Sequence, residues 1–408
     1  MTNEILRKIY RVVLTIALIL LAVAIYFLFI YKPYYHRSKT ILKGNSIEQK
    51  VTSNTVRIQG KTLYGTTVAI TQVAYPSSFK YNRPNAVILV RDDKMKDAML
   101  AARISHEPIN APILYTKKEH VPEETLKEID RLKPEGIFLD GNTKIIVIGN
   151  VDASVLKTLD NRKLKYRHIN GDNVFALSLN IDNYLAALNG DHRDAVIITS
   201  IENPQYALPQ AAWSSHSGDG FFFIQKDKIP KEVEKALKNR HGKAYIYILG
   251  GQELILNSTE KQLSKYGHVQ RIPLGNDVYS TSVGFASYKD LGKNFAWWIG
   301  KRPRDFGWGI SEPGHNFIFV NPKQWQIAVT STVLSHKGKH APILLVQENE
   351  IPDVVKNYLQ VIKPAYNSPQ EHVYNSGWII GSEDAISNLT QTKIDELLEI
   401  SMPSFQMK

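Results

Sequence analysis

The hydrophobic pattern of this chain contains a unit that occurs three times. A four-residue apolar run at 111–114, 221–224 and 341–344 is followed by a short spacer and then by an aliphatic residue and a proline, at Pro122, Pro230 and Pro352. The run is too short for a helix and, between turn-forming residues, is typical of a buried strand. Proline suits the first turn of a helix, and the acidic residues after it suit the helix dipole. Each copy therefore predicts a strand, a loop and a helix.

The order of elements extends on both sides of this unit. A Ser-His pair precedes each run, and the histidines, His106, His216 and His336, follow one another at 110 and 120 residues. Helical stretches precede the pairs at 97–104, 206–213 and 326–334, and strands precede these at 86–90, 195–199 and 317–320. Strands that run into glycine follow at 145–149, 245–250 and 378–381. Alternating strands and helices predict α/β repeats, each with a parallel sheet.

The first fifty residues differ from the rest. Residues 12–31 form a twenty-residue stretch without a charge, preceded by Arg7, Lys8 and Arg11. This length spans a hydrocarbon core, and no small-residue cleavage site follows it, so the pattern predicts an uncleaved membrane anchor. Residues 32–54 are polar and predict a tether. The cations on the two sides of the stretch nearly balance, so charge alone leaves the orientation open.

Composition narrows the classes of function. The net charge is +11, and residues 1–50 hold eight Lys or Arg and two Asp or Glu, so they contribute +6 and the other 358 residues only +5. The basic excess thus belongs largely to the membrane flank, which argues against a nucleic-acid partner. The chain has no cysteine, which excludes disulfides and thiolate metal sites.

Each copy also begins with a shared opening. Arg57, His168 and Arg271 occupy equivalent places, each followed by a glycine and then by an aromatic residue, which is Tyr64, Phe175 or Tyr279. The cations suit phosphate or carboxylate groups, because a guanidinium binds such anions bidentately. The alternative is an ordinary cation at the mouth of a strand, with the aromatic residues in core or inter-repeat packing.

These openings, with the Ala-Pro-Ile-Leu strand and the proline-initiated helix, resemble the type 2 cell-wall-binding repeat of Gram-positive surface proteins. Residues 97–102 match the family's Pro-Asp-Ala-Leu-Ala-Ala-like helix, and the likeness covers roughly 55–400. The resemblance implies three α/β domains, Toprim-like or doubly wound, about a pseudo-threefold axis. It also implies non-covalent, non-catalytic binding of an anionic cell-wall polymer in grooves between domains. The six opening residues are then polymer-binding candidates.

One feature departs from the family. Its opening carries an Asp-Arg pair before the aromatic residue, whereas this chain has Thr62-Leu63, Asn173-Val174 and Asp277-Val278. The arginine is absent from all three copies. If that arginine serves the polymer phosphates, the chain keeps the fold and loses the usual ligand.

No complete catalytic or metal set can be assembled from the sequence. Adjacent residues on a helix do not face each other, so Ser105 is not the nucleophile partner of His106, and a histidine near a helix C-terminus is explained by the dipole. His336 and His340, with His315 nearby, have a weak metal spacing across a loop. Asp92-Asp93 follows the first strand and is interpreted as a solvated turn. We expect no catalytic residue, no metal and no cofactor.

The third copy carries an insertion between its opening glycine and its first strand. It holds three tryptophans interleaved with cations, namely Trp297, Trp298, Lys301, Arg302, Arg304 and Trp308. Such a loop offers a stacking and cationic surface for a glycan, an anionic polymer or a protein partner. The alternative is a loop that folds back and caps the last repeat.

The sequence thus predicts five segments: a membrane anchor at 1–31, a linker at 32–54, and repeats at 55–166, 167–270 and 271–408. The predicted function is a single-pass, membrane-anchored cell-surface protein, mostly extracytoplasmic, that binds anionic wall polymer. The alternative is a protein-interaction scaffold of an envelope or sporulation complex that keeps the repeat fold without polymer binding.

Overall fold

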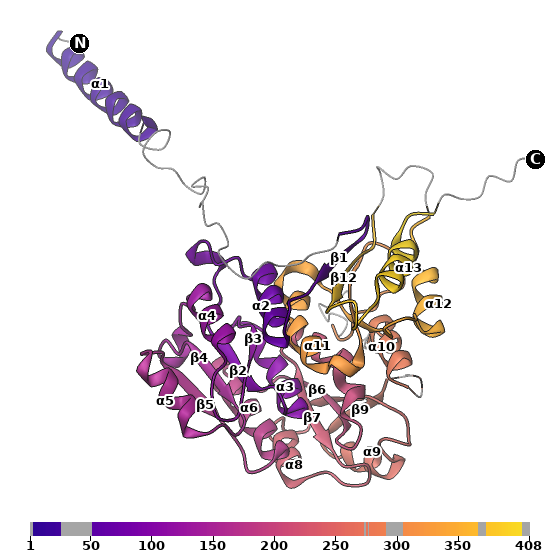
Figure 1. The fold of residues 1–408 in the computed structure, drawn as a ribbon. Helices are drawn as coiled ribbons and strands as arrows, with labels where there is room; N and C mark the ends of the chain where they lie inside the picture. The colour runs from indigo at the N-terminus through magenta and orange to yellow at the C-terminus, as the bar shows by residue number, and fades with distance from the viewer. Residues whose placement is uncertain are drawn as a thin grey trace, which may run out of the picture. The chain divides into compact units, whose positions relative to one another are not determined.

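The computed structural model of the chain describes residues 3–25, 51–272, 275, 277–290, 305–365 and 373–401 (Figure 1). The chain divides into two compact units, 1–44 and 45–408. The described part of the first unit is one helix, α1 (Asn3–Ile25). Every strand that the structure describes belongs to the second unit.

Three four-stranded sheets, all parallel, form the second unit. The first sheet has the order β3 (Ile113–Thr116), β2 (Val87–Arg91), β4 (Ile145–Ile148), β5 (Tyr166–Ile169). The second has the order β7 (Gly220–Ile224), β6 (Ala195–Ser200), β8 (Ala244–Ile248), β9 (Gly267–Arg271). The third has the order β11 (Ile343–Leu345), β10 (Asn316–Val320), β12 (Ser376–Ile380), β1 (Thr55–Ile58).

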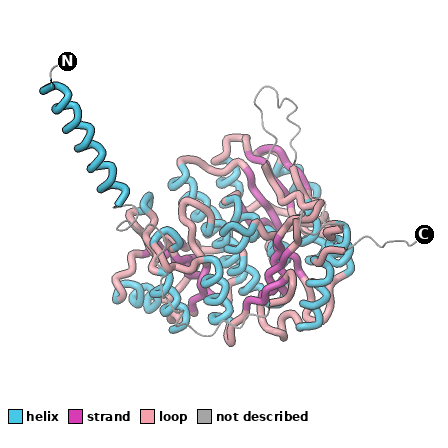
Figure 2. Tube along the Cα trace, turned by 90° about the horizontal axis from the view of Figure 1, so that it is seen from above, coloured by secondary structure: helices cyan, strands magenta, loops and turns pink. Residues whose placement is uncertain are grey.

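The strand order identifies the kind of α/β sheet. In the first two sheets the second strand along the chain is at the edge and the first strand lies between it and the third, which is the doubly wound order. Helices cover the sheets (Figure 2). The predicted α/β class with parallel sheets is confirmed, while the Toprim-like assignment and the pseudo-threefold axis stay predictions.

The strand that opens each repeat completes the sheet of the preceding repeat. β5 pairs with β4 and β9 pairs with β8, so the predicted boundaries at 167 and 271 fall inside β5 and at the last residue of β9. β1 occupies the equivalent place in the third sheet, where Thr55 to Ile58 pair with Gly377 to Ile380. The three repeats therefore exchange strands, and the exchange closes on itself.

The α-helices described in the second unit lie between consecutive strands, except α13, which follows the last strand. They are α2 (Leu63–Ala74), α3 (Met95–Ala102), α4 (Glu123–Leu132), α5 (Ala153–Asn161), α6 (Val174–Asn189), α7 (Leu208–Ser217), α8 (Lys231–Lys238), α9 (Asn257–Leu263), α10 (Val278–Ser287), α11 (Trp325–Ser331), α12 (Asp353–Val361) and α13 (Asn388–Leu398). The helices α3, α7 and α11 contact one another and join the repeats.

The helix starts differ in one respect from the sequence prediction. Pro122, Pro230 and Pro352 precede the first helical residue of α4, α8 and α12 instead of lying in the first turn, and Pro122 and Pro230 have an extended conformation. A fixed φ near −60° is compatible with this capping position as well, and the missing N–H again costs no hydrogen bond.

The opening glycines have a packing reason. A Cβ built on Gly60 would lie 2.2 Å from the backbone carbon of Gly65, in the first turn of α2. A Cβ on Gly171 would lie 2.4 Å from the Leu177 nitrogen, and one on Gly275 would lie 2.1 Å from the Ser280 Cβ. Only glycine lets the strand end approach the helix this closely.

The helix α1 carries exposed aliphatic side chains from Val12 to Ile25. Of the residues that the structure describes, none belongs to a helix that meets the length and apolarity needed to cross a membrane. The predicted membrane stretch 12–31 runs past the end of α1, and its residues 26–31 lie outside the described residues.

The glycine packing gives a first prediction. Gly60→Ala should lower the free energy of unfolding by roughly 1–3 kcal/mol, since the new methyl group overlaps the α2 backbone. Thermal and chemical denaturation of the purified chain measure this.

Gly65→Ala is the matched control. Its Cβ would lie 3.2 Å from the Thr62 hydroxyl and 3.6 Å from the Gly60 Cα, inside a helix where alanine is favoured. Equal destabilisation by both variants would contradict the account of Gly60.

Candidate functional site

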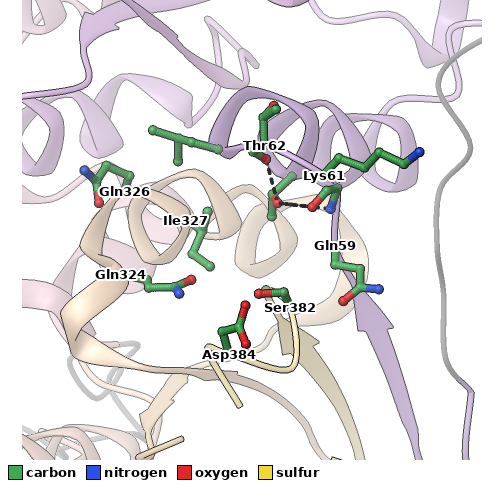
Figure 3. A pocket seen from close by; sticks show the side chains of 12 residues that line it. Gln59, Lys61, Thr62, Gln324, Gln326, Ile327, Ser382 and Asp384 are labelled. Carbon is green, nitrogen blue, oxygen red and sulfur yellow. Dashed lines mark hydrogen bonds between the residues drawn. The ribbon is translucent and has the colours of Figure 1, made fainter. Parts of the chain in front are cut away.

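A cavity of about 490 Å³ lies at the carboxyl ends of the strands of the third sheet (Figure 3). Three connections line it: the one between β1 and α2, the one between β10 and α11, and the one between β12 and α13. The lining residues are Gln59, Gly60, Lys61, Thr62, Leu63, Thr66, Gln324, Gln326, Ile327, Gly381, Ser382 and Asp384. Residues far apart in the chain therefore meet here only because β1 pairs with β12.

The position of the cavity follows from the topology. β10 and β12 are neighbours whose following connections diverge, since the chain leaves β10 toward edge strand β11, whereas β12 is followed by α13, which contacts β1 on the other side. Such a switch point leaves a crevice beyond the strand ends, where α/β proteins bind ligands. Gly381 keeps the crevice open, because it has φ +106° and a Cβ on it would lie 2.8 Å from the Ile327 Cδ1.

The lining groups are mainly uncharged and polar. Amides of Gln59, Gln324 and Gln326 and the Ser382 hydroxyl offer both donors and acceptors. Figure 3 shows Gln324, Ser382 and Asp384 around the cavity, with Lys61 extending away from them along its rim. One carboxylate inside and one ammonium at the rim suit a hydroxyl-rich ligand that also carries negative charge.

Arg57, His168 and Arg271 hold equivalent places in the sheets. Arg57 is opposite Ile379, His168 is opposite Val147, and Arg271 is opposite Ile248. Each donates a side-chain N–H to the carbonyl of the glycine at the end of the neighbouring strand, with distances of 2.9 Å to Gly381, 2.8 Å to Gly149 and 2.5 Å to Gly250. The equivalence read from the sequence is therefore reproduced in atomic contacts.

Arg57 is fully buried. Its other N–H groups donate to the Ser382 carbonyl at 3.1 Å, the Ile386 carbonyl at 2.7 Å and the Gln391 Oε1 at 3.0 Å. Arg271 makes the same pattern with the Gly251 and Ile255 carbonyls and with Glu260. Both guanidinium groups thus hold the loop after the neighbouring strand. Polymer binding by Arg57, His168 and Arg271 stays a prediction.

The three aromatic residues of the openings lie in the first turns of α2, α6 and α10. Phe175 and Tyr279 are half-buried and pack against hydrophobic clusters. Tyr64 is half-buried as well, and its hydroxyl donates to the Asp92 carboxylate at 2.7 Å. Burial and this hydrogen bond raise the pKa of Tyr64 to about 12. Asp92 is 8% exposed, so the interpretation of Asp92-Asp93 as a solvated turn is wrong for Asp92.

The residues that replace the family's Asp-Arg pair have a structural role. Thr62, Asn173 and Asp277 are the N-caps of α2, α6 and α10, and each side-chain oxygen accepts a backbone N–H of the first turn, at 2.8–2.9 Å. Threonine, asparagine and aspartate all satisfy this requirement. The first position of the pair therefore caps the helix. The absence of an arginine at the second position does not disturb this cap.

The Ser-His pairs converge at the junction of the three repeats. The ring centroids of His106 and His336 are 5.3 Å apart, and those of His216 and His340 are 4.2 Å apart. The His106 Nδ1 lies 2.8 Å from the Glu107 carbonyl, and the Ser335 hydroxyl donates to the Ala341 carbonyl. These contacts favour the structural interpretation of the pairs. Sequence reasoning missed their convergence, although their equal place in each repeat could have suggested it.

The sequence predicts no metal site. Within the described ranges, no group of three or more His, Asp or Glu side chains could hold a metal ion.

The tryptophan insertion is described only in its last part. Trp297, Trp298, Lys301, Arg302 and Arg304 lie outside the described residues. The Trp308 ring stacks on His216 with centroids 5.2 Å apart, and neighbouring Phe306 stacks on Tyr247 at 3.5 Å. This end of the insertion packs onto the second repeat. Capping of the last repeat stays a prediction. Binding by the tryptophan loop stays a prediction.

Comparisons with known proteins show one matching family and several similar proteins. Residues 57–154 match the family model described as cell wall binding domain 2. The Bacillus subtilis (strain 168) amidase enhancer is 27% identical over 285 residues, which are 69% of this chain and 34% of that protein. N-acetylmuramoyl-L-alanine amidase LytC of the same strain is 23% identical over 266 residues, which are 62% of this chain and 48% of that protein. The chain spans a third to a half of the length of these relatives.

Two solved structures share the fold. Cwp8 from Clostridium difficile has a TM-score of 0.65 and 20% identity, with 85% of this chain and 52% of that one covered. Cwp6 from the same organism has a TM-score of 0.62 and 18% identity, with 85% and 48% covered. The family match and the two sequence relatives support the cell-wall-binding family and a cell-wall-associated role, and the two solved structures support the fold alone.

The histidine junction predicts how stability depends on pH. Burial, with neighbouring His340 and His106, lowers the pKa of His216 to about 4, and burial, with His106 and Lys337, lowers the pKa of His336 to about 4, against 6.5 in the unfolded chain. Between these values the unfolded chain binds more protons. The stability contribution is therefore complete above pH 6.5 and is lost as the pH falls toward 4, by roughly 1–3 kcal/mol for each histidine.

Denaturation of the purified chain from pH 7.5 to 4 measures this dependence. His216→Gln should flatten it, whereas substitution of the exposed His241 should leave it unchanged. A pH profile that His216→Gln does not alter would contradict the assignment.

Proposed function

We propose that this chain binds an anionic cell-wall polymer, non-covalently and without catalysis, in the cavity between β1, β10 and β12. The observation that carries the proposal is the polar crevice at the switch point of the third sheet, in a chain whose residues 57–154 match a cell-wall-binding family. Its volume accommodates a few sugar units, and its lining offers many neutral hydrogen-bonding groups. The likeness to Cwp8 and Cwp6 supports the fold alone.

The lining residues have separate roles in this proposal. The Gln324 amide, the Ser382 hydroxyl and the Asp384 carboxylate bind sugar hydroxyl groups. Lys61, exposed at the rim, meets a phosphate or carboxylate of the polymer. Arg57 acts through the loop that carries Ser382 and Asp384, so it positions ligand-binding groups without touching the polymer.

The proposal places the second unit outside the cell, tethered to the cytoplasmic membrane by residues 12–31. The exposed aliphatic side chains of α1 support this part, because such a surface is stable in contact with lipid and unfavourable in water.

Membrane tethering is tested by fractionation. The full chain should sediment with membranes and resist high-salt extraction, whereas a variant lacking residues 12–31 should be soluble. Release of the full chain by salt alone would contradict a hydrophobic anchor.

A protein-interaction scaffold in an envelope or sporulation complex is the second candidate. The observation that favours it is the likeness to a protein named amidase enhancer, since that name describes an effect on another protein. Exposed Phe138 and Leu139, in a short 3-10 helix of the first repeat, are a surface that such a partner could cover.

Co-sedimentation with purified wall sacculi distinguishes the two candidates. The full chain in mild detergent should bind intact sacculi, bind weakly after the anionic polymer is stripped, and bind less at high salt. Lys61→Glu should weaken binding roughly tenfold, because it turns a charge-assisted contact into a repulsion.

Lys157→Glu is the matched control, since Lys157 is exposed on α5 and does not line the cavity. No binding to intact sacculi would overturn the polymer proposal and favour the scaffold. An equal loss of binding in both lysine variants would show that the polymer is attracted to the overall positive charge of the chain and not to the cavity.

A further inference from the structure

A polar cluster lies next to the cavity in the first repeat. The Lys117 ammonium is 2.7 Å from the Asp92 Oδ2, and the Tyr64 hydroxyl donates to the same oxygen at 2.7 Å. The ammonium also lies 5.9 Å from the centre of the Tyr64 ring. The Asp92 side chain is 10% exposed and that of Lys117 is 46% exposed. The carboxylate is therefore shielded, whereas the ammonium is open to solvent.

The other repeats lack this cluster. A turn hydrogen bond identifies the position of Lys117, whose N–H donates to the His120 carbonyl, and the same bond starts at Gln225 and Gln347 in the other repeats. Strand register places Ile201 and Pro322 where the first repeat has Asp92. The second and third repeats therefore have uncharged residues at both positions of the ion pair.

The cluster is connected to the cavity through Gln326. This residue lines the cavity, and its Nε2 donates to the Asp92 carbonyl at 3.3 Å. Its own carbonyl accepts the Tyr115 hydroxyl at 2.8 Å, on the strand that leads to Lys117. Tyr64, in the first turn of α2, lies three residues after Lys61, the cation at the cavity rim. A polymer that leaves the cavity along α2 therefore meets the Lys117 ammonium next.

The extent of the family match points to the same repeat. Residues 57–154 contain Lys61, Tyr64, Asp92 and Lys117, whereas the other two repeats lie outside the match. The additional cation thus lies within a part of the chain that matches a cell-wall-binding domain.

We propose that Lys117 forms a second anion subsite, specific to the first repeat, for the next phosphate or carboxylate of the polymer bound in the cavity. This inference rests on the proposed function. A Lys117 ammonium has three donors, so it can keep Asp92 as a partner and still bind an external anion. Asp92 neutralises part of the charge and thereby limits the affinity, and Tyr64 holds Asp92 in place.

Two substitutions separate a binding role from a structural one. If Lys117 binds the polymer, Lys117→Ala and Asp92→Asn change the affinity in opposite directions. Isothermal titration calorimetry of the full chain in mild detergent would use poly(glycerol phosphate) as the phosphate probe and polyglucuronate as the carboxylate probe. Lys117→Ala should weaken binding roughly fivefold and reduce its salt dependence. Asp92→Asn should strengthen binding roughly threefold, because it removes a competing anion while keeping an acceptor for Tyr64.

Lys118→Ala is the matched control, since Lys118 is adjacent, 47% exposed and directed to Asp152 at 3.9 Å. It should bind as the unaltered chain does. Weaker binding in both the Lys117 and Asp92 variants, with a lower melting temperature in each, would overturn the subsite and make the pair structural. Unchanged binding in Lys117→Ala, with binding still dependent on Lys61, would overturn the subsite and leave the cavity proposal standing. Failure of the unaltered chain to bind either probe would overturn both.

Discussion

The structure depends on the pairing of β1 with β12. The Gly377 N–H donates to the Asn54 carbonyl at 2.9 Å and the Gly381 N–H to the Ile58 carbonyl at 2.9 Å, so the start of the second unit becomes the edge of its last sheet. The corresponding pairs in the other sheets join strands about 20 residues apart, whereas this pair spans about 320. Loop-closure entropy makes the longer closure costlier by only about 2–3 kcal/mol. Further contacts offset that cost, including the Asn54 N–H to the Asp395 Oδ1 at 2.7 Å.

The repeats are also joined by buried ions. Arg103 of the first repeat donates to the Asp182 Oδ1 at 2.6 Å, and Arg240 donates to both carboxylate oxygens of Asp182 at 2.8 and 3.0 Å. Burial alone would raise the pKa of Asp182, but Arg103, His192 and Arg240 hold it well below its usual range. Buried ion pairs add little net stability, yet loss of one partner leaves an uncompensated charge. This network therefore fixes which surfaces meet rather than how strongly they adhere.

Much of the fold could be predicted from local pattern. The apolar runs, the Pro-initiated helices and the equivalence of Arg57, His168 and Arg271 all depend on neighbours in sequence, and the structure reproduces them. The exchange of strands could not be predicted, because β1 has the same pattern whether it pairs within its own repeat or with β12. The cavity was missed for the same reason, since Gln59, Gln324 and Asp384 come from three distant connections. The burial of Arg57 was likewise invisible, because its acceptors are mainly backbone carbonyls that any sequence supplies.

The repeats separate the residues that maintain the fold from those that bind. Arg57 and Arg271 hold equivalent loops through equivalent backbone carbonyls. The opening glycines and the N-caps are also equivalent in all three copies. At the strand ends the first two copies differ, with exposed Lys61 in the first and exposed Asp172 in the second. A position that must satisfy backbone groups tolerates few side chains, whereas a position that faces solvent beyond a strand end tolerates many. Leu63, Val174 and Val278, which stand where the resembling family has an arginine, therefore leave the N-caps before them undisturbed. The ability to bind a ligand therefore has to be tested for each repeat separately. Three repeats with the same backbone structure need not have three equivalent binding sites.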